Sequence, residues 1–355
     1  MKYQSLTIEN FRGIEKLEIN DLKRLNLLVG RNNCGKTSIL EAFFLLSGMS
    51  NPNLPVTIHR YRDLFITDDE DFSYIFTNLN FETPIHLKGK LDDDKRDLKI
   101  SPLYTDNNPP HSQKNGDKVL SNQQEIYTAS TDIIHLIEGI KYEFRDSHDQ
   151  VFHGQISLKE SSVSIPRSFK EVLKCSFLNP KTSTMTPSKQ IENLLVQKRL
   201  DTVISVLKNI EPAVVDIRMG GESGLIYVDV GTEKLMPMNI MGDGMRRILA
   251  LLTILAETKN GILLIDEIEN GLHYTTIKLA WKAIIAACKE YDVQLIASTH
   301  SYDCIEALAN AYTEMEPEGD DIRLFRIDRD GKKHTAFSAS AQVLRVGIEK
   351  EFEVR

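Results

Sequence analysis

The sequence is poor in cysteine. Its 355 residues include four cysteines, and no two of them form a C-x-x-C pair. A disulfide framework or a zinc knuckle needs such spacing, so the sequence supports neither. The four positions are Cys34, Cys175, Cys288 and Cys304.

Long hydrophobic runs are also absent. The longest, Ala42–Leu46 and the largely apolar Ile248–Ala256, fall well short of the roughly 18 residues that span a bilayer. Met1–Asn20 alternates in polarity and carries several charges, so it lacks the apolar stretch of a secretory signal. We therefore expect a cytoplasmic protein without a membrane partner.

Basic residues are fewer than acidic residues, 43 against 51. The formal net charge is −8, which argues against a surface that binds nucleic acid over its whole extent but leaves room for a local basic groove. Apolar residues make up 41% and charged residues 26% of the chain. These proportions are those of a globular protein and exclude a disordered or fibrous one.

The sequence does contain a complete phosphate-binding loop. Gly30–Ser38 reads Gly-Arg-Asn-Asn-Cys-Gly-Lys-Thr-Ser and matches G-x-x-x-x-G-K-[ST]. In this pattern glycines let backbone N–H groups curl around phosphate oxygens, the lysine reaches the β- and γ-phosphates, and a hydroxyl serves Mg²⁺. The candidate nucleotide-binding residues are Asn32, Asn33, Cys34, Gly35, Lys36, Thr37 and Ser38, and Thr37 is also a candidate metal ligand.

The flanking sequence supports the motif. Leu25–Val29 predicts a buried strand before the loop, and Ile39–Leu46 predicts an apolar helix after it. The N-terminus of such a helix favours an anion through its dipole and its free N–H groups. A glycine-rich turn without a ligand is the alternative, and these flanks disfavour it.

Two downstream motifs add chemistry suited to phosphates. Gly261–Glu267 is an apolar strand that ends in two carboxylates, the arrangement called Walker B. Asp266 is the candidate Mg²⁺ ligand, and Glu267 is the candidate for aligning a water with the γ-phosphate. His300 follows a later predicted strand, where its imidazole can hydrogen-bond the γ-phosphate. Glu267, His300 and Lys36 are thus the candidate catalytic residues. The alternatives are that Asp266 and Glu267 are a surface pair without a ligand and that His300 has no functional role.

A second candidate anion-binding helix start lies before Walker B. Met241–Arg247 reads Met-Gly-Asp-Gly-Met-Arg-Arg and opens a predicted helix. One chain rarely needs two such helix ends for one nucleotide, so we expect an ATP-dependent homodimer or higher oligomer in which this segment closes on the γ-phosphate held by Lys36 of another copy. A capping turn is the alternative. The candidate residues are Gly242, Asp243, Gly244 and Arg246.

The pattern of strands and helices predicts an α/β fold with a mainly parallel sheet and an antiparallel N-terminal sheet. Residues 1–50 and 213–355 supply the two halves of this head, and 51–212 forms an α+β insertion between them. Within the insertion we expect mobile loops at 101–131 and 179–189.

Two local patterns complete the expected structure. The spacing of apolar residues predicts one helix over 189–210 in the insertion. An Asp330-Gly331 turn predicts a hairpin between strands at 322–328 and 333–337. A calcium loop at this turn is disfavoured, since Lys332 occupies the next expected ligand position.

These motifs together resemble those of the ATP-binding-cassette (ABC) ATPases. The branch they resemble contains RecF, the structural-maintenance-of-chromosomes (SMC) heads and the overcoming-lysogenisation-defect (OLD) family. The residue pattern is closest to that of OLD-type ATPases in Ile8–Ile14, Met241–Arg247 and Asp266–His273. The resemblance implies an ABC-type head that uses ATP and Mg²⁺. It also implies a D-loop near a dimer seam, with Asn270, Gly271 and His273.

Some positions depart from the family pattern. Gly242 replaces the serine that contacts the γ-phosphate in the transporter signature L-S-G-G-Q, so we expect the backbone to make that contact, helped by Asp243 or Arg246. Tyr274 replaces a proline found in many relatives, and no glutamine can be assigned to the Q-loop. Arg12 has two interpretations, a contact with the nucleotide and a packing role.

The resemblance implies an enzyme that hydrolyses ATP to ADP and phosphate and regulates a separate effector, such as a nuclease or toxin, in bacterial antiphage defence. The alternative is a RecF-like protein that binds DNA in an ATP-dependent manner during repair or recombination. The altered signature and the long insertion disfavour a transporter ATPase. Nuclease activity within this chain is not expected, because no Toprim domain follows the ATPase motifs and the histidines of 51–212 are scattered.

Overall fold

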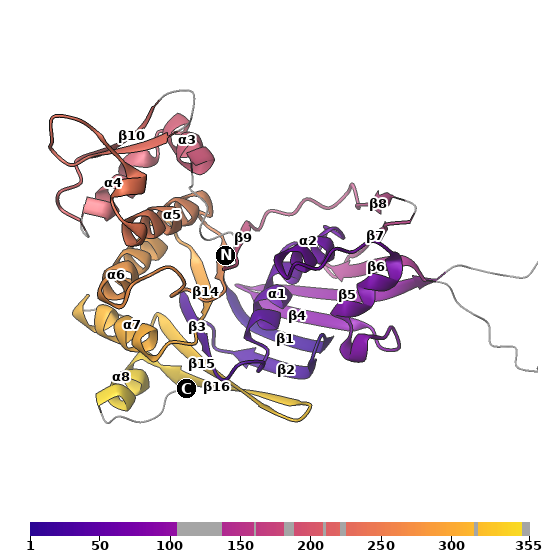
Figure 1. The fold of residues 1–355 in the computed structure, drawn as a ribbon. Coiled ribbons are helices and arrows are strands. Elements are labelled where there is room, and N and C mark those ends of the chain that lie inside the picture. Colours follow the sequence, from indigo (N-terminus) through magenta and orange to yellow (C-terminus); the bar gives the residue numbers. More distant parts are fainter. Residues whose placement is uncertain are drawn as a thin grey trace, which may run out of the picture.

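Three β-sheets and the helices between them make up the fold in the computed structural model (Figure 1). The described residues are 1–104, 137–159, 161–180, 188–208, 211–220, 225–315 and 319–349.

The first sheet is antiparallel and has the strand order β2-β1-β4-β5-β6-β7-β8. Alternate side chains of β1, including Leu6 and Ile8, are fully buried, as the period of two in a strand requires when one face covers a core. The strands are β1 Tyr3–Phe11, β2 Ile14–Asn20, β4 Ile85–Leu91, β5 Asp94–Tyr104, β6 Ile137–Arg145, β7 Val151–Ser157 and β8 Ser162–Ser164.

The second sheet has the order β16-β15-β3-β14-β13-β9, and all its pairs are parallel except β15 with β16. Its strands are β3 Leu25–Val29, β9 Cys175–Leu178, β13 Ile262–Ile265, β14 Gln294–Ser298, β15 Ile322–Asp330 and β16 Lys333–Ser340. The prediction of a mainly parallel sheet beside an antiparallel N-terminal one is therefore confirmed.

The second sheet separates two hydrophobic clusters. On β3, Leu25, Leu27 and Val29 belong to one cluster, and Leu28 belongs to the other. All of β3 is buried, which explains why parallel strands covered on both faces read as continuous apolar runs rather than alternating ones.

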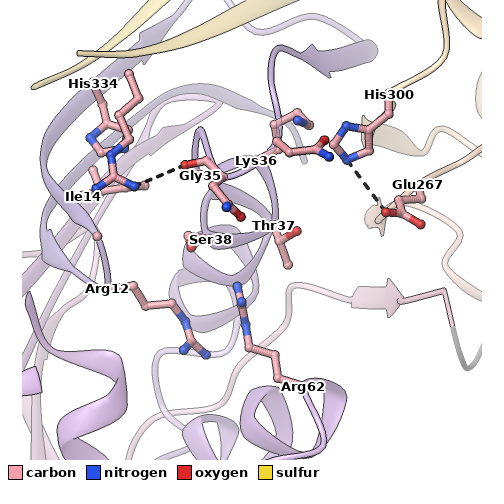
Figure 2. Close-up of a pocket in the computed structure, with 14 residues that line it drawn as sticks. Arg12, Ile14, Gly35, Lys36, Thr37, Ser38, Arg62, Glu267, His300 and His334 are labelled. Atoms are coloured by element: carbon pink, nitrogen blue, oxygen red, sulfur yellow. Dashed lines mark hydrogen bonds and ion pairs between the residues drawn. The ribbon is translucent and has the colours of Figure 1, made fainter. Parts of the chain in front are cut away.

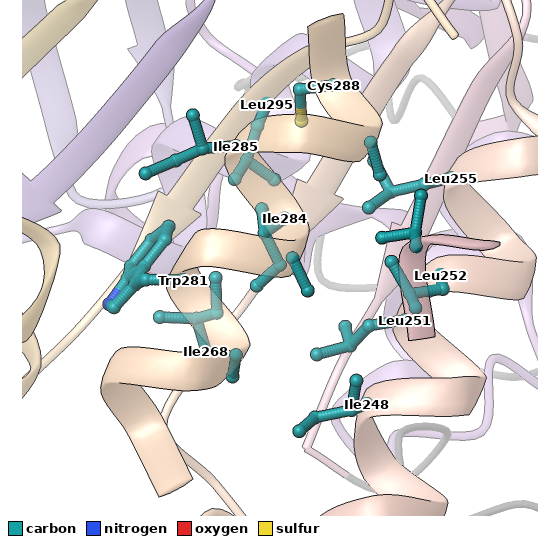
Figure 3. Packing of buried hydrophobic residues seen from close by; sticks show 14 of the residues in the cluster. Ile248, Leu251, Leu252, Leu255, Ile268, Trp281, Ile284, Ile285, Cys288 and Leu295 are labelled. Atoms are coloured by element: carbon teal, nitrogen blue, oxygen red, sulfur yellow. The ribbon is translucent and has the colours of Figure 1, made fainter. Parts of the chain in front are cut away.

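Helices cover both faces of the second sheet. Helix α1, Lys36–Ser47, packs between the two sheets, with contacts to β1, β4 and β5 on one side and to β13 and β14 on the other. The opposite face carries α5, Asp243–Glu257, α6, Tyr274–Glu290, and α7, Tyr302–Glu314. Figure 3 shows the apolar side chains of α5 and α6 meeting in this layer. The indole N–H of Trp281 donates to the carbonyl of Cys304 over 3.1 Å, so α6 and α7 are also joined by a buried hydrogen bond.

A small lobe lies beside α5 (Figure 1). It contains helices α3, Ser188–Val196, and α4, Leu200–Lys208, and the three-stranded sheet β10-β11-β12, with bounds Asp216–Gly220, Leu225–Asp229 and Met236–Pro237. The single helix predicted over 189–210 is wrong, because the chain breaks at Lys198, whose φ of 57° is left-handed.

The segment 51–212 is not confined to one region. It supplies β4 to β8 to the first sheet and β9 to the second. The predicted loop at 101–131 starts too early, since 101–104 belong to β5; residues 105–131 lie outside the described part. In the second predicted loop, Ser188 and Lys189 belong to α3, and 181–187 lie outside the described residues.

Shorter elements complete the described chain. Helix α2, Leu54–Tyr61, follows α1, and α8, Ala341–Glu349, packs on α7, β15 and β16. The 3₁₀ turns are η1 Asp69–Ile75, η2 Thr77–Leu79 and η4 Met238–Ile240. Over the residues that the structure describes, every helix is too short or too polar to cross a bilayer.

Candidate functional site

The phosphate loop connects β3 to α1, as predicted, and two glycines shape it. Gly30 has φ of 139°, and a Cβ there would lie 2.4 Å from the carbonyl oxygen of Ile327 on β15. Gly35 has φ of 99° and immediately precedes α1. Both conformations favour glycine, so the loop's path depends on these two residues.

Lys36 is folded back into this loop. Its ammonium donates to the carbonyls of Gly30 at 2.8 Å and Arg31 at 2.9 Å, and lies 3.7 Å from Sγ of Cys34. The residue is only 5% exposed. A nearly buried cation at the start of a helix creates a strongly positive environment for an anion.

The Walker B carboxylate reaches the same helix start. The Thr37 hydroxyl donates to Oδ2 of Asp266 over 2.9 Å. The Ser298 hydroxyl donates to Oδ1 of Asp266 over 2.5 Å and accepts from the backbone N–H of Glu267 at 2.9 Å. One buried hydroxyl at the end of β14 therefore positions both acidic residues at the end of β13.

Glu267 and His300 are the more accessible part of the site. Nε2 of His300 lies 3.8 Å from Oε1 of Glu267, and their side chains are 37% and 42% exposed. Glu267 has φ of 53°, a left-handed backbone that a glutamate rarely adopts and that is common at functional sites. The backbone N–H of His300 donates to Oε1 of Glu269 over 2.8 Å, so a second carboxylate positions the histidine's backbone.

A buried carboxylate holds two arginines beside α1. Glu41, which is 1% exposed, lies 2.6 Å from Nε of Arg12 and accepts from Nε of Arg62 at 2.6 Å. Burial lowers the pKa of Arg12, and the nearby Glu41 opposes this effect. Arg12 therefore has a packing partner and also lines the cleft, so both of its interpretations fit the structure.

The C-terminal hairpin β15–β16 contacts the phosphate loop. Arg329 donates to the carbonyl of Asn33 over 3.3 Å, and the Lys332 ammonium lies 3.1 Å from Glu15 at the start of β2. The predicted hairpin is confirmed, but its turn is Gly331 and Lys332, because Asp330 still belongs to β15 and pairs with Lys333. The hairpin thus closes one side of the site, which its sequence alone did not indicate.

These elements enclose one cleft of about 820 Å³ (Figure 2), a size typical of small-molecule sites. In Figure 2 Glu267 and His300 lie at one end, Ile14 and His334 at the other, and the loop between them. The lining residues are Arg12, Gly13, Ile14, Asn32, Asn33, Gly35, Lys36, Thr37, Ser38, Arg62, Glu267, His300, Arg329 and His334.

The structure leaves some predicted residues outside this cleft. Cys34 is buried and lines a neighbouring hollow behind the loop. Gly242 precedes α5 and has φ of 91°, while Asp243 is the first residue of that helix and Gly244 follows. Among the residues whose side chains the structure describes, Gly242, Gly244 and Arg246 do not line the cleft. The nearest atoms to a Cβ on Gly244 would be those of Thr276 on α6, at 3.4 Å.

Sequence reasoning missed several residues around the site. Arg62 and His334 lie in segments without a motif, and Glu41 and Ser298 look like ordinary members of a helix and a strand. Glu41 offered one signal, because a carboxylate in the apolar stretch Ile39–Leu46 must find a partner if it is buried.

The side chains of the cleft suit a nucleotide with Mg²⁺. Magnesium prefers hard oxygen ligands and is commonly held by one or two protein groups together with substrate phosphates. Thr37 and Asp266 supply a hydroxyl and a carboxylate within 2.9 Å of each other, next to Lys36. The donor set therefore fits the ion and a polyphosphate side by side.

The fold assigns the molecule to a class of proteins. The Smc head domain from Pyrococcus furiosus, solved with an extended coiled coil and bound to the C-terminal domain of ScpA, matches 98% of this chain and 99% of its own, with a TM-score of 0.51 and 12% identity. The fold is that of an SMC head, an ABC-type P-loop ATPase head.

The sequence comparisons give the family. The family described as "AAA domain, putative AbiEii toxin, Type IV TA system" matches residues 25–303, and the chain belongs to it. A Helicobacter pylori protein named ATP/GTP phosphatase is 24% identical over 340 residues, covering 88% of this chain and 89% of the relative. The DNA replication and repair protein RecF of Clostridioides difficile is 47% identical over a local stretch of 47 residues, 13% of each chain.

Proposed function

We propose that this protein is an OLD-like ATPase that binds ATP with Mg²⁺, dimerises around ATP, and regulates a separate effector. The observation that carries the proposal is that Lys36, Thr37 and the Glu267–His300 pair line one cleft, with Asp266 hydrogen-bonded to Thr37. Phosphoryl transfer to water needs these groups: a cation and a metal site for the phosphates, and a carboxylate near the attacking water.

Each group has a role that follows from its chemistry. Lys36 binds the β- and γ-phosphates by leaving the loop carbonyls that it now contacts. Thr37 and Asp266 would hold Mg²⁺, which neutralises phosphate charge when bound. Glu267 orients the water, and His300 contacts the γ-phosphate.

The loop residues and the nearby arginines complete the binding role. Asn32, Asn33, Gly35 and Ser38 line the cleft at the loop, and Cys34 lines the neighbouring hollow. Arg12, held by Glu41, adds positive charge near the phosphates.

The proposed dimer is supported by the position of the segment at Gly242. Gly242 is exposed, and within the described part of the chain no heavy atom beyond Gly242 and its two neighbours in sequence lies within 4 Å of where its Cβ would be. Since this segment lies outside the cleft of its own chain, we propose that Gly242, Asp243, Gly244 and Arg246 complete the cleft of a second copy, with Asn270, Gly271 and His273 near the seam.

Two of the comparisons support an effector. The family description names a putative toxin of a type IV TA system, which supports an association with a toxin. The role in bacterial antiphage defence is proposed from the resemblance to OLD-type ATPases. The Smc head was solved with a bound protein domain, which shows that this fold can carry a partner. A RecF-like role in DNA repair is the second candidate, and the local similarity to RecF is its support.

The Glu267→Gln variant tests the scheme. It should bind ATP but hydrolyse it about a hundredfold more slowly, since the general base is removed, and should therefore accumulate as an ATP-bound dimer. Mass photometry should show an ATP-dependent doubling of mass in Glu267→Gln and none in Glu267→Gln combined with Lys36→Ala. If the protein is a constitutive oligomer, its mass does not change with ATP. The measurement is then whether Glu267→Gln retains ATP through gel filtration.

The same variant separates the two candidate roles. ATP-dependent binding of duplex DNA that falls steeply with salt would favour the RecF-like role. Unchanged mass together with no retained nucleotide would overturn the ATPase scheme.

A further inference from the structure

Three strongly exposed apolar side chains lie beside the cleft and beside the segment at Gly242. Phe65 is 78% exposed, Ile240 is 66% exposed and Tyr274 is 69% exposed. Phe65 follows the cleft residue Arg62 by three positions, so their Cα atoms lie within about 11 Å of each other. Ile240 precedes Gly242 by two positions, which limits that distance to about 8 Å. Exposed apolar groups that gather at such places are typical of surfaces that bind another protein.

The exposure of Phe65 is fixed by the backbone on both sides of it. The N–H of Leu64 donates to the carbonyl of His59 over 3.0 Å. The N–H and the hydroxyl of Thr67 donate to Oδ2 of Asp71 over 2.8 Å and 3.2 Å. The segment that carries Phe65 is therefore held in place after α2, and the ring projects from it into solvent.

Ile240 and Tyr274 flank the start of α5 from two directions. Ile240 ends the η4 turn just before Gly242, and Tyr274 is the first residue of α6. A Cβ on Gly244 would lie 3.4 Å from the side chain of Thr276 on α6, so the first turns of α5 and α6 are in contact. The two exposed apolar side chains thus border the same helix start.

Within one chain, Phe65 lies on the opposite side of the second sheet from Ile240. Helix α2 packs on α1, and its Ile58 belongs to the hydrophobic cluster on that side, whereas α5 and α6 belong to the other cluster. Figure 1 shows α2 beside α1 and away from α5 and α6. The exposure of Phe65 and Ile240 shows that they do not bury each other, so a contact between them requires a second chain.

We propose that Phe65 of one copy packs against Ile240 and Tyr274 of the other when two copies close on ATP. This rests on the proposed function, in which the segment at Gly242 meets the cleft of a second copy. Such closure brings the neighbours of Arg62 to the neighbours of Gly242, and a two-fold axis makes the same contact twice. The cleft is polar, so these contacts supply the apolar part that a stable interface needs.

The first test measures dimerisation in the Glu267→Gln parent, which retains ATP. Adding Phe65→Ser should weaken the ATP-bound dimer about a hundredfold, because each of two equivalent contacts loses about tenfold. Ile240→Ser should have a similar effect. Analytical ultracentrifugation gives the dimer dissociation constant. Calorimetry should show ADP affinity within about twofold of the parent, since Phe65 and Ile240 lie outside the lining of the cleft.

Val343→Ser is the matched control. Val343 is 58% exposed and lies on α8. This helix follows Ser340, which pairs with Arg323 at the end of the hairpin that is away from the phosphate loop. The control should dimerise as the parent does. If Phe65→Ser and Ile240→Ser dimerise as well as Val343→Ser, the proposed contact is wrong.

Crosslinking tests the contact directly, and it also applies to a constitutive oligomer. Phe65→Cys and Ile240→Cys are combined in the Glu267→Gln parent, and a short bismaleimide linker is added with ATP. We expect covalent dimers, and none from the parent with its native cysteines alone. ATP-bound dimers that fail to crosslink would overturn the proposal and leave these side chains to a different partner, such as the effector.

A failure of the proposed function gives a different result. In that case the Glu267→Gln parent itself neither dimerises with ATP nor retains ATP through gel filtration.

Discussion

The phosphate loop and the segment at Gly242 each precede a helix, but their surroundings differ. The loop is enclosed: Lys36 is nearly buried, Asp266 contacts Thr37, and the hairpin closes one side. The segment at Gly242 is open, since among the described residues only its neighbours in sequence approach the position that a Cβ on Gly242 would take. A helix start that is open at Gly242 leaves room for a second molecule. The predictions below test this difference.

The largest effect should separate binding from hydrolysis. Lys36→Ala should weaken ATP binding about a hundredfold, because it removes a charged contact to two phosphates. Gly242→Asp should leave ATP affinity within about threefold and abolish hydrolysis, since a carboxylate there repels the γ-phosphate of the neighbouring copy. Calorimetry and phosphate release measure the two quantities. Equal loss of ATP affinity in both variants would remove the distinction.

A smaller effect concerns how the enclosed site is supported. Glu41→Ala should lower the free energy of unfolding by about 3 kcal/mol, because it leaves Arg12 and Arg62 without their shared buried partner. Glu18→Ala is the control, since its ion pair with Lys16 is exposed, and it should cost less than about 1 kcal/mol. Urea unfolding would decide, and similar losses in the two variants would show that Glu41 does not support the cleft.

The smallest effect concerns Glu269. Glu269→Ala removes the acceptor for the backbone N–H of His300 and should lower kcat about tenfold with unchanged ATP affinity. Glu269→Gln keeps an oxygen acceptor and should restore most of the rate. If the glutamine variant were as slow as the alanine variant, the charge of Glu269 rather than its hydrogen bond would matter.

The sequence predicted features whose residues are adjacent in the chain and missed features formed by residues that are far apart in it. The loop from Gly30 to Ser38 and the strand before Asp266 are continuous motifs, so their elements were predictable. Ser298 contacts Asp266 across 32 positions of the chain and His334 approaches Gly35 only through tertiary packing, so neither carries a local pattern. Strand β9 was also missed. It has four residues and pairs with β13, so it is too short for a periodic pattern of apolar residues to be recognised.

The most direct test of the shared site is to mix two inactive variants. Lys36→Ala keeps an intact Gly242 turn, and Gly242→Asp keeps an intact phosphate loop, so a mixed dimer contains one complete site. Our account predicts that each variant alone is inactive in phosphate release and that the equimolar mixture recovers up to about a quarter of wild-type activity, as random pairing of a symmetric dimer requires. A mixture that stays at the background of its components, while a pull-down through an affinity tag on one variant recovers the untagged other and so shows that mixed dimers form, would contradict it.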